Sequence, residues 1–184
     1  LTVVPMQDYL ELTNEVGRMN VPAVAEGNWT WRLSPRYKTA GLINKIKKCE
    51  PDIIAVTGDV IDSYKTDTQA AITFMKEASV IAPCYFSPGN HEQRLPDDYN
   101  TLKSELESYD ITILENESLT LQHNEDNINI IGLLDPNFSL EDPKTYLSTQ
   151  LSSPKTESEN FTLLLSHRPE LFETYVEYDV DLVL

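Results

Sequence analysis

PDIIAVTGDVIDS, residues 51–63, contains the clearest strand pattern in the chain and indicates how the segments around it are arranged. Its apolar run, residues 53–57, is short and continuous, which predicts a strand buried on both faces. Pro51 ends the helical pattern before it, and Gly58-Asp59 follows the strand as a turn that carries a carboxylate. A buried strand that lies between a helical pattern and a polar turn indicates a sheet covered by helices.

Helical and strand patterns alternate outward from this stretch. Apolar residues at helical spacing predict helices, short apolar runs predict strands, and the polar residues 124–127 indicate a β-hairpin. The predicted helices span residues 39–48, 66–78, 96–109, 142–151 and 169–178. The predicted strands span residues 53–57, 80–86, 111–114, 119–122, 128–133, 161–166 and 181–184. This order predicts an α/β sandwich with a mixed sheet.

The composition is globular and strongly acidic. The 184 residues include 30 acidic and 14 basic side chains, a net charge of -16. Such a charge repels phosphate backbones, so we expect no binding to nucleic-acid backbones, whereas a divalent cation is attracted. No apolar run reaches the roughly 18 residues of a membrane span and no signal peptide is evident, so a cytoplasmic location is the default expectation. The two cysteines are too few for a disulfide framework.

Polar residues whose side chains can bind a metal ion follow three of the predicted strands. Asp59 follows the first, the run Gly89-Asn90-His91-Glu92 follows the second, and His167 follows the strand at residues 161–166. Ligand sites in such sheets form beyond the carboxyl ends of the strands. Carboxylate, amide oxygen and imidazole suit a borderline divalent cation such as Mn²⁺, Fe²⁺ or Zn²⁺. The three strand ends together therefore predict a metal site.

Each of these features alone has a simpler interpretation. Gly58-Asp59 is a common turn pair, and residues 89–92 could form a turn with exposed polar side chains. His167 could simply cap the helix predicted after it. Glu92 could orient His91 or lie in solvent, and we favour solvent. A metal site is favoured only because these features occur together, at the ends of three predicted strands.

The segments PDIIAVTGDVIDS (51–63), SPGNHE (87–92) and LLLSHRPE (163–170) resemble the central motifs of the calcineurin-like metallophosphoesterases. The resemblance covers about residues 40–184 and includes IIGLLDP (130–136), as in a bacterial subgroup. It implies a layered αββα sandwich and two divalent metal ions that hold a hydroxide for attack on a phosphate mono- or diester. It also implies that Asp59, Asn90 and His167 bind metal. His91 would protonate the leaving group or steady the charge that develops on phosphate.

Two motifs of that family do not occur in this chain. The family begins with a strand that ends in Asp-x-His, and none of the three histidines here, His91, His123 and His167, follows an aspartate by two positions. The family also ends with Gly-His-x-His, whereas this chain stops at Leu184 within an apolar run. We therefore expect a fragment, incomplete at both ends, with at most one weak metal site and little or no turnover.

Residues 1–37 have a different character from the rest. They are nearly neutral, carry both tryptophans, Trp29 and Trp31, and show little periodicity, so we expect an appendage followed by a partial phosphoesterase domain at residues 38–184. RMN-x-P and GNW-x-WR resemble the carboxyl-terminal segment of bacterial 4-α-glucanotransferases, a segment without the catalytic carboxylates of that family. This combination predicts a chimera, joined near residues 35–40, that arose in sequence assembly or gene prediction.

The expected function is thus hydrolysis of a small phosphate ester, impaired in this chain. Two alternatives stay open: a 4-α-glucanotransferase fragment that acts on α-glucans, and a non-catalytic α/β binding module. A metal titration distinguishes the phosphoesterase from these alternatives, because only the phosphoesterase predicts Mn²⁺ binding that depends on Asp59.

Overall fold

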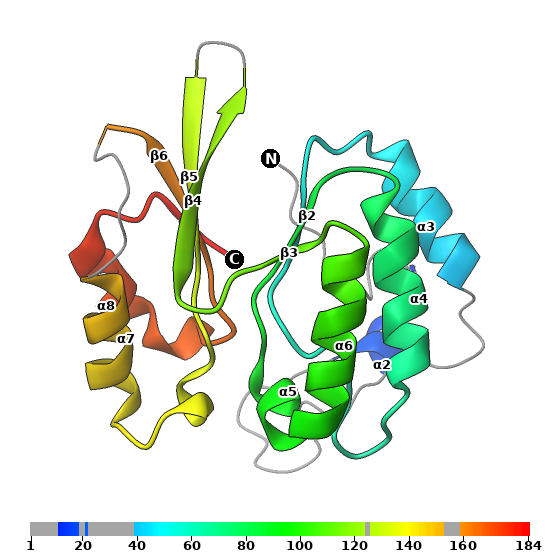
Figure 1. The fold of residues 1–184 in the computed structure, drawn as a ribbon, viewed down its shortest axis with the longest axis horizontal. Coiled ribbons are helices and arrows are strands. Elements are labelled where there is room, and N and C mark those ends of the chain that lie inside the picture. The colour runs from blue at the N-terminus through cyan, green and yellow to red at the C-terminus, as the bar shows by residue number, and fades with distance from the viewer. Residues whose placement is uncertain (1–10, 19–20, 22–38, 124–125, 153–158) are drawn as a thin grey trace. The chain divides into compact units, whose positions relative to one another are not determined.

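The computed structural model describes residues 11–18, 21, 39–123, 126–152 and 159–184 (Figure 1). The chain divides into two compact units, Leu1–Pro51 and Asp52–Leu184. The first unit contains α2 (Asn14–Gly17) and α3 (Thr39–Lys48), and Lys45 of α3 forms an ion pair of 2.9 Å with Glu11. Both tryptophans and all but the last residues of the expected joint lie outside the described residues. The domain boundary after residue 37 stays a prediction.

Three parallel strands form the first sheet of the second unit. Their order is β1 (Ile54–Val56), β2 (Cys84–Phe86) and β3 (Thr112–Ile113). The helices α4 (Thr68–Ser79) and α6 (Pro96–Ser108) connect them and cover one side of the sheet (Figure 1). Asp67 caps α4 by accepting a hydrogen bond from the N–H of Ala70, and Pro96 occupies the first turn of α6.

Two of the strand predictions differ from this sheet. The predicted strand at residues 80–86 begins only at Cys84, because Pro83 has no N–H to donate and contributes only its carbonyl, which accepts from Ile54. β1 is half-buried instead of buried on both faces. It lies at the edge of the sheet, with β2 as its only paired strand among the described residues.

A second sheet has the order β4 (Glu117–His123), β5 (Asp126–Gly132), β6 (Phe161–Leu165) and β7 (Leu182–Val183). β4 and β5 are antiparallel and the other pairs are parallel, so the predicted hairpin and mixed sheet are confirmed. α7 (Pro143–Leu151) matches its prediction. The predicted helix at 169–178 is wrong as one element, because it is broken into two 3-10 turns, Pro169–Leu171 (η2) and Val176–Tyr178 (η3), around α8 (Phe172–Tyr175).

Apolar side chains from both sheets form a shared core, as expected for a sandwich. Its buried members come from β2, β5, β6 and the end of β3: Tyr85, Leu114, Ile130, Leu163 and Leu165. A second core lies on the other face of the four-stranded sheet, where α7 and α8 cover it (Figure 1). The predicted class, a layered α/β sandwich, is confirmed. No helix within the described ranges is long and apolar enough to cross a membrane.

Candidate metal centre

The carboxyl ends of β1, β2 and β6 bring together three of the residues predicted to bind metal. Nε2 of His167 lies 3.1 Å from Oδ2 of Asp59 and 3.1 Å from Oδ1 of Asn90. Asp59 comes from the turn after β1, Asn90 begins the short helix α5 (Asn90–Arg94) after β2, and His167 follows β6. Residues separated by as many as 108 positions in the chain thus converge, because β1 and β2 of the three-stranded sheet and β6 of the four-stranded sheet bring their carboxyl ends together.

Two glycines allow the turns after β1 and β2 to approach each other. Gly58 has a φ of +93°, and a Cβ at this position would lie 2.4 Å from the backbone N of Gly89. A Cβ on Gly89 would lie 2.5 Å from Oδ1 of Asp59. Asp59 itself has a φ of 56°, in the left-handed region. The close approach of these two backbones is therefore what places the Asp59 carboxylate beside α5.

The hydrogen bond at the other nitrogen of His167 determines which of its atoms faces the cluster. Nδ1 lies 2.7 Å from the carbonyl oxygen of Thr57, which can only accept, so Nδ1 carries the proton. Nε2 then directs a lone pair toward the oxygens of Asp59 and Asn90, which also have lone pairs. Three electron-pair donors in one place require a cation between them, either a proton on His167 or a metal ion. The donor set therefore fits a divalent cation.

Asp59 and His167 shift each other's pKa toward the charged forms. Burial raises the pKa of Asp59, but the hydrogen bond and charge of His167, with contributions from His91, outweigh burial and lower it. Burial lowers the pKa of His167, and the hydrogen bond and charge of Asp59 outweigh burial and raise it. Both side chains remain partly open to solvent, at 31% and 22% exposure. A metal ion can thus reach the site and displace the proton.

His91 lies against the same cluster but in a different hydrogen-bonding state. Its Nδ1 accepts a hydrogen bond of 2.8 Å from the backbone N–H of Ser63, so the neutral ring carries its proton on Nε2. Nε2 lies 3.8 Å from Oδ2 of Asp59, and the His91 side chain is 10% exposed. The backbone N–H of His91 also donates to Oδ1 of Asp59 at 3.0 Å. His91 therefore presents a hydrogen-bond donor toward the cluster.

Glu92 is fully buried, so the prediction that it lies in solvent is wrong. Its Oε2 accepts hydrogen bonds of 2.8 Å from the N–H groups of Asp59 and Gly89, and its Oε1 accepts one of 3.2 Å from Ile61. Burial raises the pKa of Glu92 even though the backbone hydrogen bonds lower it. The carboxylate joins the turn after β1 to the start of α5. Its position three residues after the helix cap is that of a capping-box glutamate, the signal that could have revealed it.

A second group missed by the sequence analysis is the ion pair of Arg168 and Asp135. Nε and one terminal nitrogen of Arg168 donate to the two oxygens of Asp135 at 2.6 and 3.0 Å, a bidentate geometry. The Asp135 side chain is fully buried. The hydroxyl of Tyr175 donates to the carbonyl of Arg168 and lies 2.7 Å from Oγ of Ser166. These contacts fix the turn that carries His167.

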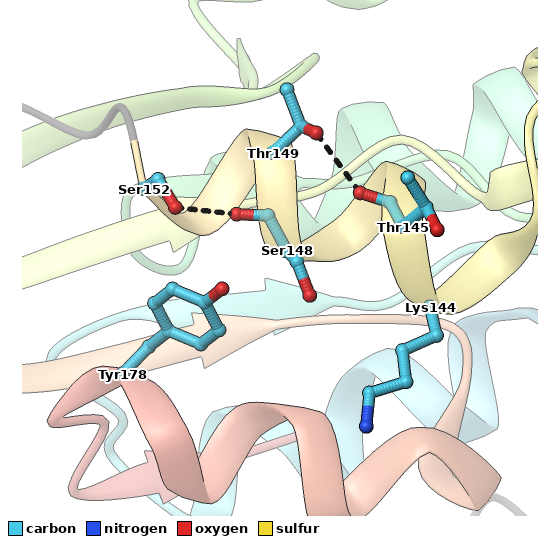
Figure 2. Close-up of a pocket in the computed structure, with 6 residues that line it drawn as sticks. All are labelled: Lys144, Thr145, Ser148, Thr149, Ser152 and Tyr178. Carbon is cyan, nitrogen blue, oxygen red and sulfur yellow. Dashed lines mark hydrogen bonds between the residues drawn. The ribbon is translucent and has the colours of Figure 1, made fainter.

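The described residues contain no group of three His, Cys, Asp or Glu side chains arranged to hold a metal. The candidate centre has only two side chains of these types, Asp59 and His167, and its third donor is the amide of Asn90. A separate cavity of about 370 Å³ lies between α7 and η3 (Figure 2) and shares no residue with the centre. It is lined by Lys144, Thr145, Ser148, Thr149, Ser152 and Tyr178. Two of its hydroxyls, on Thr149 and Ser152, donate to carbonyls of α7 itself.

Two similarities to known proteins were found, one over most of the chain and one over a shorter stretch. Residues 34–184 match the family described as calcineurin-like phosphoesterase. Over 58 residues, the chain is 40% identical to the protein "4-alpha-glucanotransferase, chloroplastic/amyloplastic" of Solanum tuberosum. That second match covers 32% of this chain and 10% of the plant protein, so the chain spans about a tenth of that relative.

Proposed function

The chain belongs to the calcineurin-like phosphoesterase family, and on this premise we propose that its strand-end cluster binds a divalent cation and hydrolyses a phosphate mono- or diester. The observation that carries the proposal is the convergence of Asp59, Asn90 and His167, whose acceptor atoms need a cation between them, either a proton on His167 or a metal ion. Phosphoester hydrolysis is the activity of the family. The ligand set and the two-ion mechanism are implied by the resemblance of the motifs, and for this chain they are part of our proposal.

In this proposal Asp59, Asn90 and His167 would hold one divalent cation, and Asp59 would also serve the second ion of a complete family site. When bound, such ions neutralise the phosphate, orient it and lower the pKa of a bound water molecule to about 7. His91 donates a hydrogen bond from Nε2 to the ester, which steadies the charge that develops on phosphate. The N–H of Ser63 at Nδ1 favours this donor role over full proton transfer. Glu92 holds the two ligand loops together.

Because the chain contains neither Asp-x-His nor Gly-His-x-His, we propose one weak site and little turnover for the 184-residue chain itself. The test is a titration with Mn²⁺, in which calorimetry measures binding to the wild type, Asp59→Ala and Asp126→Ala. Asp126 is an exposed aspartate at the start of β5 and serves as the matched control. We expect saturable binding by the wild type and the control, and its loss in Asp59→Ala. Equal binding by all three would contradict the proposal.

The similarity to a 4-alpha-glucanotransferase supports a second candidate, α-glucan transfer. The residues that we compared with that family, 1–37, lie mostly outside the described ones and include none of its catalytic carboxylates. Disproportionation of maltose by the purified chain, independent of Mn²⁺, would favour this candidate over the first. A chain that binds Mn²⁺ but shows none of the low turnover proposed above would instead favour a binding module.

A further inference from the structure

Tyr64 is an exposed aromatic residue five positions after Asp59. Its side chain lies in the loop between β1 and α4 and is 80% exposed. The ring centroids of Tyr64 and His91 are 5.7 Å apart, with an angle of 64° between the ring planes. In this edge-to-face arrangement one ring supports the other and leaves much of the Tyr64 surface open to a ligand.

Hydrogen bonds within the loop hold Tyr64 in this position. The N–H of Ser63 donates to Nδ1 of His91, and the N–H of Tyr64 donates to Oδ1 of Asp62 at 3.0 Å. The hydroxyl of Thr66 donates to the carbonyl of Asp62 at 2.9 Å. The residue before Tyr64 is thus tied to the same imidazole that Tyr64 contacts. This preorganisation lowers the entropy cost of binding a group on the ring.

We infer that Tyr64 is a specificity-determining residue that packs against the ester group of the substrate, and that the preferred substrates are phosphate esters with an uncharged aromatic ester group. The inference rests on the proposed function, which places the phosphate at Nε2 of His91. An ester group that extends from the phosphate past His91 then meets the open surface of Tyr64. An aromatic group gains contact area and edge or stacking interactions there, whereas a small alkyl group does not.

The charge around the loop explains why the ester group should be uncharged. Oδ1 of Asp62 lies 3.3 Å from Nδ1 of His91, and the Asp62 side chain is only 20% exposed. The chain as a whole carries a net charge of -16. A second anionic group on the substrate would therefore be repelled at this side of the site.

The experiment compares the binding of phenyl phosphate and ethyl phosphate to the 184-residue chain, by calorimetry, with and without Mn²⁺. The proteins are the wild type, Tyr64→Ala, Tyr64→Phe and, as a matched control, Phe172→Ala, which removes a 61% exposed aromatic ring from α8. We expect the wild type to prefer phenyl phosphate by about three- to tenfold. Tyr64→Ala should lose this preference, while Tyr64→Phe and Phe172→Ala retain it.

The outcomes separate this inference from the proposed function. Equal affinity for both esters in the wild type, or a preference that survives Tyr64→Ala, would overturn the role of Tyr64. The proposed function would not be affected. If neither ester binds, with or without Mn²⁺, the proposed function is overturned and this inference with it. Saturation transfer from the protein to the phenyl protons, lost in Tyr64→Ala, would give the same answer independently of affinity.

Discussion

The carboxylate of Glu92 accepts a hydrogen bond of 2.8 Å from the backbone N–H of Asp59, although the two residues are 33 positions apart. The same oxygen accepts from Gly89, and the other from Ile61. Glu92 therefore fixes the backbone on both sides of the Asp59 carboxylate. It acts through the loops that carry the ligands and has no contact of its own with the proposed cation.

Replacement of Glu92 by alanine should leave three N–H groups without their acceptor in a buried site. We expect the free energy of unfolding to fall by about 3 kcal/mol. Glu92→Gln should cost less, because one amide oxygen can still accept from both Asp59 and Gly89. Urea denaturation of these variants measures the difference, with the exposed Glu107→Ala as control. Loss of equal size in Glu92→Gln and Glu92→Ala would show that packing matters more than these hydrogen bonds.

Gly89→Ala should disrupt the centre without removing any ligand. The added Cβ would lie 2.5 Å from Oδ1 of Asp59, so the carboxylate or its loop has to move. We expect Mn²⁺ affinity to fall at least tenfold. Gly41→Ala is the matched control: a Cβ there meets nothing within 4 Å, and alanine in a helix should raise stability by about 0.5–1 kcal/mol. Unchanged Mn²⁺ affinity in Gly89→Ala would mean that the close approach is not needed.

The Arg168–Asp135 pair should matter for stability beyond its charge. Asp135→Asn leaves Arg168 without its bidentate partner, at an expected cost of about 3 kcal/mol. Arg168→Lys keeps the charge but cannot form two parallel hydrogen bonds, so it should also destabilise the fold. Thermal unfolding of both variants tests this. If Arg168→Lys matched the wild type, a single charge contact would be sufficient for the role of this pair.

Burial raises the pKa of the Cys84 thiol from 9.0 to about 11. The folded state therefore keeps this proton at pH values where the unfolded state loses it, and stability should fall as the pH rises from about 9 to about 11. The full loss is about 2–3 kcal/mol. Urea denaturation at pH 8, 9, 10 and 11 measures the slope, and Cys84→Ala should flatten it. An identical slope in the variant would assign the effect to other groups.

The two cysteines should also differ in reactivity. Cys49 is exposed and Cys84 is buried. A thiol reagent at pH 8 should therefore modify one cysteine quickly and the second only on unfolding, and Cys49→Ser should remove the fast phase. Rapid modification of both thiols in the folded protein would contradict the burial of Cys84.

Much of the fold follows from local patterns. The apolar runs at residues 53–57 and 161–166 predicted the strands that precede Asp59 and His167. The second run is buried along most of its length as expected, whereas β1 is half-buried at the edge of its sheet. The segment at residues 169–178 was predicted as one helix because its spacing is helical. Its breaks depend on tertiary contacts such as the hydroxyl of Tyr175 at Arg168, which no local pattern reveals.

The same distinction holds at the centre. Asp59, Asn90, His91 and His167 were singled out because they follow predicted strands and lie in motifs that resemble the family, and the structure brings all four together from two sheets. Glu92 was misjudged, since a glutamate in a polar turn is usually solvated. Its burial depends on three N–H groups from two loops, which only the folded chain assembles. Asp135 and Arg168 are 33 positions apart, and their pairing is equally invisible in sequence.

The most direct test of the central claim uses the three histidines as probes. Nitrogen-15 imidazole spectra, recorded during titration with Mn²⁺, report which rings lie near the bound ion. We predict selective broadening of His167 and then His91 at low Mn²⁺, with His123 at the end of β4 unchanged, and loss of this pattern in Asp59→Ala. Before Mn²⁺ is added, at a pH where the rings are neutral, His91 should carry its proton on Nε2. Broadening of His123 alone, or of all three rings equally, would contradict a metal centre built by Asp59, Asn90 and His167.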